Sequence, residues 1–77
     1  MQMFIKTLIG KTITIDVKPN TTCNDIKDII VNQESEYSDK SRIRLIFCGK
    51  VCDDNKTVKE YKFSSEGHVH LVYRNVD

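Results

Sequence analysis

Cysteine and histidine are the residue types in this 77-residue sequence that could bind a metal, change redox state or transfer protons. Cys48 and Cys52 are separated by three residues, but no second Cys or His pair follows at the spacing of a zinc site. His68 and His70 lie two apart on one face of a predicted strand, where they could bind a metal weakly or respond to pH. The sequence places no carboxylate or thiol to join them. We therefore predict structural thiols, no metal site and no cofactor.

Other signatures of catalysis are equally weak. The three glycines, Gly10, Gly49 and Gly67, are isolated and form no phosphate-binding loop. No nucleophile, base and orienting group are placed together, so we expect no enzymatic activity. Twelve Lys and Arg residues oppose eleven Asp and Glu residues, and the formal net charge is +1. Because the two signs are interspersed, we expect no binding to nucleic acid.

The length and composition indicate one small globular domain over residues 1–77. Hydrophobic residues make up 39% and charged residues 30%, which excludes a disordered tail. The apolar runs are too short to span a membrane, and the first residues do not resemble a signal peptide. Three cysteines cannot all pair within one chain, so we expect a reducing compartment, the cytoplasm or the nucleus. We also expect a monomer.

Alternation of apolar and polar residues predicts most of the strands. Met1, Met3 and Ile5 share one side of the first stretch, and Gln2, Phe4 and Lys6 share the other. A second alternating stretch follows after Gly10, which predicts a β-hairpin. Further strands are expected after the middle of the chain and near its end, with Val69, Leu71 and Tyr73 facing inward. The predicted strands cover residues 1–7, 12–17, 42–47, 50–52 and 67–74.

One helix is predicted between the hairpin and the third strand. Apolar residues recur at helical spacing from about 23 to 34, and Thr22 with Asp25 forms a weak capping box. Residues 35–41 are polar and predict an irregular loop, and Thr57 could cap one helical turn over 57–61. The order of elements predicts an α+β fold with a mixed sheet of four to five strands packed on one α-helix.

Three aliphatic residues break the rule that apolar side chains face inward. Ile46 shares a strand face with Arg42 and Arg44, Val72 lies between His70 and Arg74, and Leu8 lies at the hairpin tip. One exposed aliphatic residue needs no explanation. Three that converge, with Arg44, Lys50 and His70 at the rim, would form a binding patch. Phe4 is a fourth exposed residue, which could form a smaller surface or simply contact Thr12 or Thr14 across the hairpin.

Three sequence motifs resemble ubiquitin closely, and the match extends over essentially the whole chain. They are Met-Gln-x-Phe-x-Lys-Thr-Leu-x-Gly-Lys-Thr-Ile-Thr at positions 1–14, Arg44-Leu45-Ile46-Phe47-x-Gly49-Lys50, and His70-Leu71-Val72-x-Arg74. The resemblance implies the β-grasp fold. It also implies that Leu8, Ile46, His70 and Val72 form the patch that ubiquitin-binding domains recognise, surrounded by Arg44, Gly49, Lys50 and Arg74. A second surface would consist of Gln2, Phe4 and Thr12.

The chain departs from ubiquitin in ways that change the expected function. Ubiquitin ends in Arg-Leu-Arg-Gly-Gly, whereas this sequence reads Arg74-Asn75-Val76-Asp77, so we expect no conjugation unless a longer precursor is made. Residues 35–43 are two residues longer and lack the Pro-Pro pair. Ubiquitin's second apolar patch is therefore expected to be lost at Glu36 and Asn75, unless Tyr37 substitutes.

Four lysines have counterparts among the lysines on which ubiquitin chains are built: Lys6, Lys11, Lys27 and Lys50. They are possible modification acceptors, but solvated surface charges are the simpler interpretation. Five core positions carry substitutions, which we expect to leave the fold correct but less stable than ubiquitin: Met3, Cys23, Cys52, Val58 and Phe63.

The sequence thus predicts a ubiquitin-like module that binds proteins with ubiquitin-binding domains, such as the proteasome or ubiquitin-pathway enzymes, without covalent attachment. Two alternatives remain open. The chain could be a covalent modifier whose Gly-Gly tail is missing from this sequence, or the N-terminal ubiquitin-like domain of a longer protein.

Overall fold

The computed structural model describes residues 2–47, 49–61 and 69–74. Within these ranges lie five strands, two α-helices and two short 3-10 helices. In chain order these are β1 (Gln2–Thr7), β2 (Thr12–Asp16), α1 (Cys23–Gln33), η1 (Ser35–Tyr37), η2 (Lys40–Arg42), β3 (Ile43–Phe47), β4 (Lys50–Val51), α2 (Val58–Tyr61) and β5 (Val69–Tyr73). Among the described residues, no helix combines the length and the apolar content needed to cross a bilayer.

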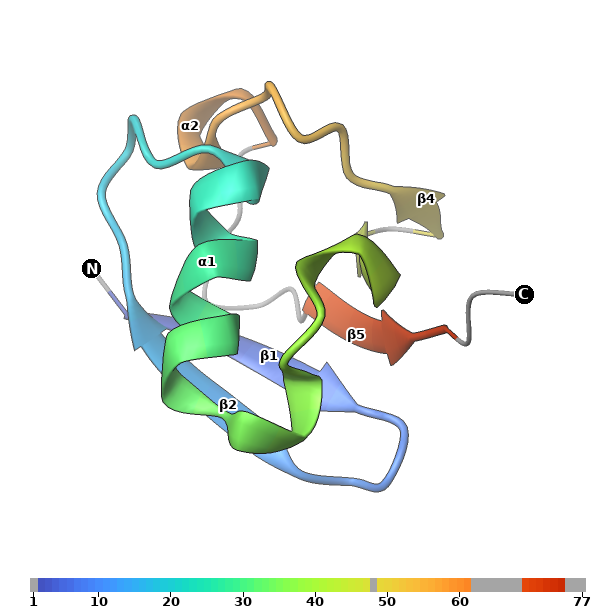
Figure 1. Ribbon diagram of the computed structural model, residues 1–77. Coiled ribbons are helices and arrows are strands. Elements are labelled where there is room, and N and C mark those ends of the chain that lie inside the picture. Colours follow the sequence, from blue (N-terminus) through green and yellow to red (C-terminus); the bar gives the residue numbers. More distant parts are fainter. Residues whose placement is uncertain (1, 48, 62–68, 75–77) are drawn as a thin grey trace.

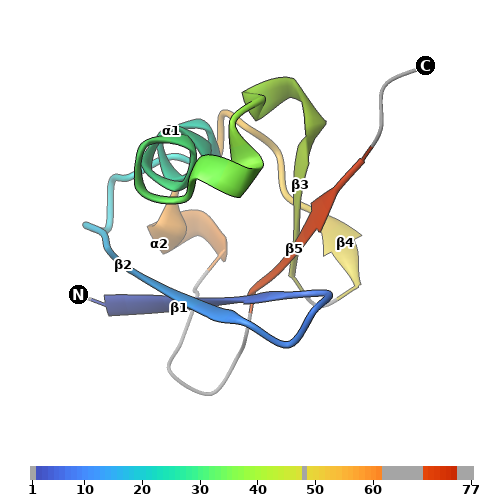
Figure 2. The same cartoon turned by 60° about the horizontal axis from the view of Figure 1, so that its bottom comes forward.

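The strands form one sheet in the order β2-β1-β5-β3-β4. The central pair, β1 and β5, is parallel, and the other three pairs are antiparallel. Figure 1 shows α1 lying across one face of this sheet, and Figure 2 shows the helix and the sheet as two layers. This arrangement confirms the predicted α+β fold of β-grasp type, and the sheet formed by the described residues has five strands, within the predicted four to five.

The core lies between α1 and the inner face of the sheet. It contains every second residue of the strands and one stripe of the helix, as the alternation and the helical spacing predict. Of the five substituted core positions, four are buried and Phe63 lies outside the described residues. The buried apolar residues are Met3, Ile5, Ile13, Ile15, Val17, Cys23, Ile26, Ile30, Tyr37, Ile43, Leu45, Cys52, Val58, Val69 and Leu71.

Helix α1 begins at a complete capping box. The Thr22 hydroxyl accepts a hydrogen bond from the Asp25 amide at 3.1 Å, and the Asp25 carboxylate accepts one from the Thr22 amide at 3.2 Å. These bonds satisfy amides that have no partner within the helix. The helix ends at Gln33, one residue earlier than predicted, because Glu34 adopts an extended conformation. The predicted cap at Thr57 is also present, since its hydroxyl accepts from the Glu60 amide at 3.2 Å.

The prediction of an irregular loop over residues 35–41 is wrong. The segment forms η1 and the start of η2, because the Tyr37 ring is buried and packs edge-to-face on Tyr73 at 5.3 Å between centroids. The Tyr73 hydroxyl accepts a hydrogen bond from the Asp39 amide at 3.1 Å, and the Asp39 carboxylate accepts two from Ser41. These contacts order a segment whose composition is polar.

Candidate functional site

The strand register brings three of the four patch residues together on the outer face of the sheet. Ile46 of β3 pairs with His70 of β5, and Arg44 pairs with Val72. Directly paired residues project from the same side of a sheet, so these four side chains are neighbours on one face. Alternation puts this face opposite the core residues Leu45 and Leu71. Ile46 and Val72 are half-buried by their neighbours, and His70 is exposed.

Val51 extends this face, and the sequence analysis missed it. Val51 lies on β4, pairs with Ile46 across the edge of β3 that faces away from β5, and is 61% exposed. The signal for it was the adjacent Cys52, which is buried, because a neighbour of an inward-facing strand residue faces outward. We call the surface made by Ile46, Val51, His70 and Val72 the outer-face patch.

Leu8 lies at the hairpin tip, where 80% of it is exposed. It directly follows Thr7, which pairs with Leu71, so it extends past the end of the β1–β5 ladder. No register pair joins it to the outer-face patch among the described strands. Instead it lines a shallow pocket of about 170 Å³ with Ile9, Tyr37, Leu71 and Tyr73. Tyr37 therefore contributes to an apolar surface here, and Glu36 is exposed beside it.

Gly49 and Lys50 lie in the turn between β3 and β4. Gly49 has a φ of 77°, a conformation that side chains rarely adopt, although a Cβ there would meet nothing within 4 Å. The residue is therefore suited to the turn by its backbone freedom and not by lack of space. Lys50 is exposed and pairs with Phe47, so the register places it on the alternate side from Ile46 and Val51.

The predicted rim residues Arg44 and Arg74 differ in their contacts. The Arg44 guanidinium folds back to donate to the Ser41 carbonyl at 2.9 Å and to the Ile43 carbonyl at 3.2 Å. Arg74 is exposed, and its backbone amide donates to the Arg42 carbonyl at 2.9 Å. Lys6 joins this basic rim, because it pairs with His70 in the parallel register. The outer-face patch is thus apolar and lies among basic side chains.

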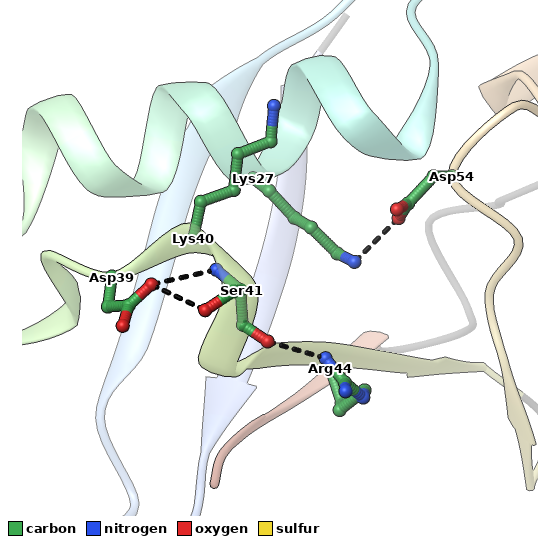
Figure 3. Close-up of a pocket in the computed structure, with 6 residues that line it drawn as sticks. All are labelled: Lys27, Asp39, Lys40, Ser41, Arg44 and Asp54. Atoms are coloured by element: carbon green, nitrogen blue, oxygen red, sulfur yellow. Dashed lines mark hydrogen bonds and ion pairs between the residues drawn. The ribbon is translucent and has the colours of Figure 1, made fainter. Parts of the chain in front are cut away.

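Arg44 also lines a polar pocket of about 480 Å³ between α1, η2 and the loop that carries Asp54, drawn in Figure 3. Figure 3 shows Lys27 directed at Asp54, and Asp39 bound to Ser41. Lys40 is paired with Asp28 at 2.8 Å. Each charge drawn there has a partner within the molecule, and the ion pairs of Lys27 with Asp54 and of Lys40 with Asp28 join α1 to the loop after β4 and to η2.

The second predicted surface, Gln2, Phe4 and Thr12, lies on the β1–β2 hairpin. Phe4 is 40% exposed and pairs with Thr14, while Thr12 pairs with Lys6. Phe4 therefore lies directly across from Thr14 and diagonally from Thr12. The exposed side chain of Gln2 pairs with Asp16 at the far end of the hairpin.

The four candidate acceptor lysines have different surroundings. Lys6 and Lys50 are exposed. Lys11 forms ion pairs with Glu34 and Glu36, and these bonds raise the pKa of its ammonium above the ordinary value. Lys27 is buried, with its Nζ 2.5 Å from the Asp54 carboxylate. The expectation that all four are solvated surface charges is therefore wrong for Lys27.

The two cysteines that the structure describes lie in the core. Cys23 and Cys52 are both buried and free. Cys48 and His68 lie outside the described residues. Interaction with the Cys52 thiol, together with burial, raises the pKa of Cys23, and interaction with the Cys23 thiol lowers the pKa of Cys52. Within the described part of the chain, no three His, Cys, Asp or Glu residues form a metal-binding group.

Comparison with known proteins agrees with this geometry. The model of the ubiquitin family matches residues 3–75. The ubiquitin-like protein NEDD8 of Dictyostelium discoideum is 39% identical over 72 residues, which cover 94% of this chain and 91% of that protein. Ubiquitin-like protein 1 of Schizosaccharomyces pombe is 36% identical, with 94% and 90% covered. The human UV excision repair protein RAD23 homolog B is 31% identical over 73 residues, which cover 94% of this chain but 18% of that protein.

Proposed function

This chain belongs to the ubiquitin family, and we propose that it is a non-enzymatic interaction module that binds ubiquitin receptors without covalent attachment. The proposed contact is the outer-face patch, and Leu8 at the hairpin tip is a further contact in this proposal, although no strand pair joins it to the patch. The observation that carries the proposal is the register of β3, in which Ile46 lies between His70 and Val51. With Val72, this register puts aliphatic residues of three strands, Ile46, Val51 and Val72, on the side of the sheet opposite the core.

The rim of the patch indicates the chemistry of the partner. Lys6, Arg44 and Arg74 are basic, so a partner with acidic residues around an apolar centre would be attracted and correctly oriented. An amphipathic helix with aliphatic residues on one face and Asp or Glu at its borders fits this description. Ubiquitin-binding domains of proteasomal receptors and pathway enzymes are the class of partner we infer, in the cytoplasm or the nucleus.

The expected affinity is modest. Burying three aliphatic side chains contributes roughly 5–9 kcal/mol gross. Association and ordering remove several kcal/mol, which leaves dissociation constants from about 10 μM to 1 mM. This range suits transient recognition.

The relatives favour two alternative functions. Resemblance to NEDD8 over nearly its whole length favours a covalent modifier. Resemblance to a short part of RAD23 homolog B favours a domain within a longer protein. The noncovalent proposal is supported by the register of the outer-face patch, which needs no chemistry at the end of the chain.

Binding is tested by titrating isotope-labelled protein with a helical ubiquitin-binding domain and following amide chemical shifts. Ile46→Ala should weaken the affinity about tenfold, because each tenfold loss corresponds to about 1.4 kcal/mol and the truncation removes about that much contact. Ile9→Ala is the matched control, since Ile9 is 75% exposed and lies at the hairpin tip away from β3. Equal affinity of Ile46→Ala and the unaltered protein would refute the proposal.

The covalent alternative requires a separate assay. The chain is incubated with activating enzyme and ATP, and the products are separated on a non-reducing gel. We expect no thioester. A thioester band sensitive to reductant would contradict the noncovalent proposal, and a Cys48→Ser protein controls for disulfide adducts at that thiol.

A further inference from the structure

A pocket of about 510 Å³ lies at the β4 edge of the sheet, between β4, the loop over residues 53–56 and α2 (Figure 1). We propose that this pocket receives an aromatic side chain flanked by carboxylates, carried by the same partner that covers the outer-face patch, a role that rests on the proposed function. The residues that line the pocket are Phe47, Lys50, Val51, Asp53, Lys56, Glu60 and Tyr61.

Val51 joins the pocket to the outer-face patch. It pairs with Ile46 of β3, which puts it on the outer face, and it also lines the pocket. Phe47 and Lys50 pair with each other on the alternate side of the same two strands. Because β4 is the last strand of the sheet among the described residues, residues from both sides meet around its edge. A partner that covers Ile46 therefore has a continuous path over Val51 into the pocket.

Hydrogen bonds hold one wall of the pocket in place. The Tyr61 hydroxyl accepts from the Asp53 amide at 2.5 Å, which ties α2 to the loop after β4. The Asp53 carboxylate accepts from the Asn55 amide at 2.9 Å, and the Asp53 carbonyl accepts from the Lys56 amide at 3.1 Å. Phe47, which also lines the pocket, packs against the core. The fold therefore forms the pocket before a ligand arrives, as is usual for binding sites.

The rings that line the pocket favour an aromatic occupant. Phe47 and Tyr61 are both half-buried, and Val51 adds an exposed aliphatic surface beside them. Aromatic side chains in edge-to-face or offset contact gain more than their buried area alone provides. The volume also falls in the range of small-ligand pockets, about 300–1,000 Å³, so one aromatic side chain and its adjoining backbone fit.

The charges around the pocket favour acidic residues beside that ring. Both lining carboxylates already accept bonds within the molecule, Asp53 from an amide of its own loop and Glu60 from the Thr57 hydroxyl. Lys50 and Lys56 are exposed, and neither forms an ion pair within the part of the chain that the structure describes. Carboxylates of the occupant would therefore meet two ammonium groups that have no carboxylate partner there.

The second contact should strengthen binding modestly. An aromatic contact and an exposed ion pair each contribute a few-fold, and ordering of the added segment offsets part of the gain. We expect a binding domain that carries the acidic aromatic segment to bind about five- to tenfold more tightly than the same domain without it.

The test titrates the isotope-labelled full chain with a helical ubiquitin-binding domain and with two extended versions of it. The extension is Asp-Phe-Glu on a flexible Gly-Ser linker, placed at the N-terminus in one version and at the C-terminus in the other. At least one extended version should bind about fivefold or more tightly and shift the amide signals of residues 53–56. Replacing the phenylalanine of the extension by alanine should remove the gain.

Lys56→Glu and Lys59→Glu form a matched pair of variants. Both lysines are exposed and the charge change is the same, but only Lys56 lines the pocket. Lys56→Glu should reduce the gain from the extension to less than about twofold and leave the affinity for the plain domain unchanged. Lys59→Glu should keep the gain. Equal affinities for the plain and extended domains, or a gain that both variants leave alike, would overturn the proposal.

The Asp-Phe-Glu peptide alone, blocked at both ends, separates failure of the pocket from failure of the proposed function. At millimolar concentration it should shift the amides of residues 53–56 in the unaltered protein and in Ile46→Ala, but not in Lys56→Glu. If the plain domain does not bind while the peptide gives these shifts, the proposed function is wrong and the pocket assignment stands. If the peptide gives no such shifts, the pocket assignment is wrong, whether or not the plain domain binds.

Discussion

The buried ion pair between Lys27 and Asp54 allows a quantitative test of how α1 is held to the loop after β4. Lys27 is 6% exposed and its Nζ lies 2.5 Å from the Asp54 carboxylate, whose side chain is 51% exposed. Removing one member of a fully buried pair costs about 3–5 kcal/mol, because the remaining charge has no compensation. Water reaches half of Asp54, so we expect Asp54→Ala to cost about 1–3 kcal/mol.

Lys27→Met should behave differently. It removes the charge but keeps an unbranched apolar stem, and the Asp54 carboxylate that remains can turn to water. We expect the free energy of unfolding to change by less than about 1 kcal/mol in either direction. Adding Asp54→Ala to Lys27→Met should then cost much less than Asp54→Ala alone. The backbone bond from Asn24 to the Asp54 carbonyl is present in every variant.

The measurement is thermal and urea unfolding followed by circular dichroism at neutral pH. For a domain of this size, each kcal/mol shifts the Tm by about 4–8 °C, so Asp54→Ala should lower it by about 5–20 °C. If Lys27→Met and Asp54→Ala lower the stability equally, and the double variant loses the sum of both, the two groups act independently. The assignment of a coupled buried pair would then be wrong.

Three further predictions concern the helix cap and the ordered segment before β3. Thr22→Ala should cost about 1 kcal/mol in urea unfolding, because it removes the acceptor of the Asp25 amide. Tyr73→Phe removes the hydroxyl that accepts a hydrogen bond from the Asp39 amide, so hydrogen exchange at that amide should become faster. The stability loss should be about 0.5–1.5 kcal/mol. The bonds from Ser41 lower the pKa of Asp39 below its ordinary 3.8. Asp39 therefore stabilises the fold above that value and loses its effect as the pH falls through the lowered pKa. In an acid titration followed at the Ser41 amide, the wild-type protein should show this pH dependence, and Asp39→Asn should abolish it.

The alternation in the sequence predicted the two faces of the sheet because each strand has one buried side. Ile43 and Leu45 are buried on one side of β3, and Ile46 lies on the other, as their positions indicate. The same argument applied to Cys52 would have identified Val51. The periodicity of apolar residues predicts which side of a strand or helix is buried, and this prediction needs no information about the segments that pack against it.

Contacts between distant segments could not be predicted in this way. Tyr37 lies in a polar stretch, and its burial depends on Tyr73, which is on another strand. The sequence suggests that Lys27 is a surface charge, but in the folded protein the loop that carries Asp54 lies beside it and pairs with its ammonium. For such residues the sequence predicts the chemical type, and the tertiary structure decides the environment.

The parallel pairing of β1 with β5 has a consequence for mechanical unfolding. Ile5 lies beside Val69 and Thr7 beside Leu71, so the first and the last strand of the sheet run side by side in the same direction. A force that pulls the two ends of the domain apart loads all the hydrogen bonds of this ladder in shear at once, and none can open ahead of the others. A molecular motor that unravels the chain from either end would therefore meet its highest resistance at the beginning.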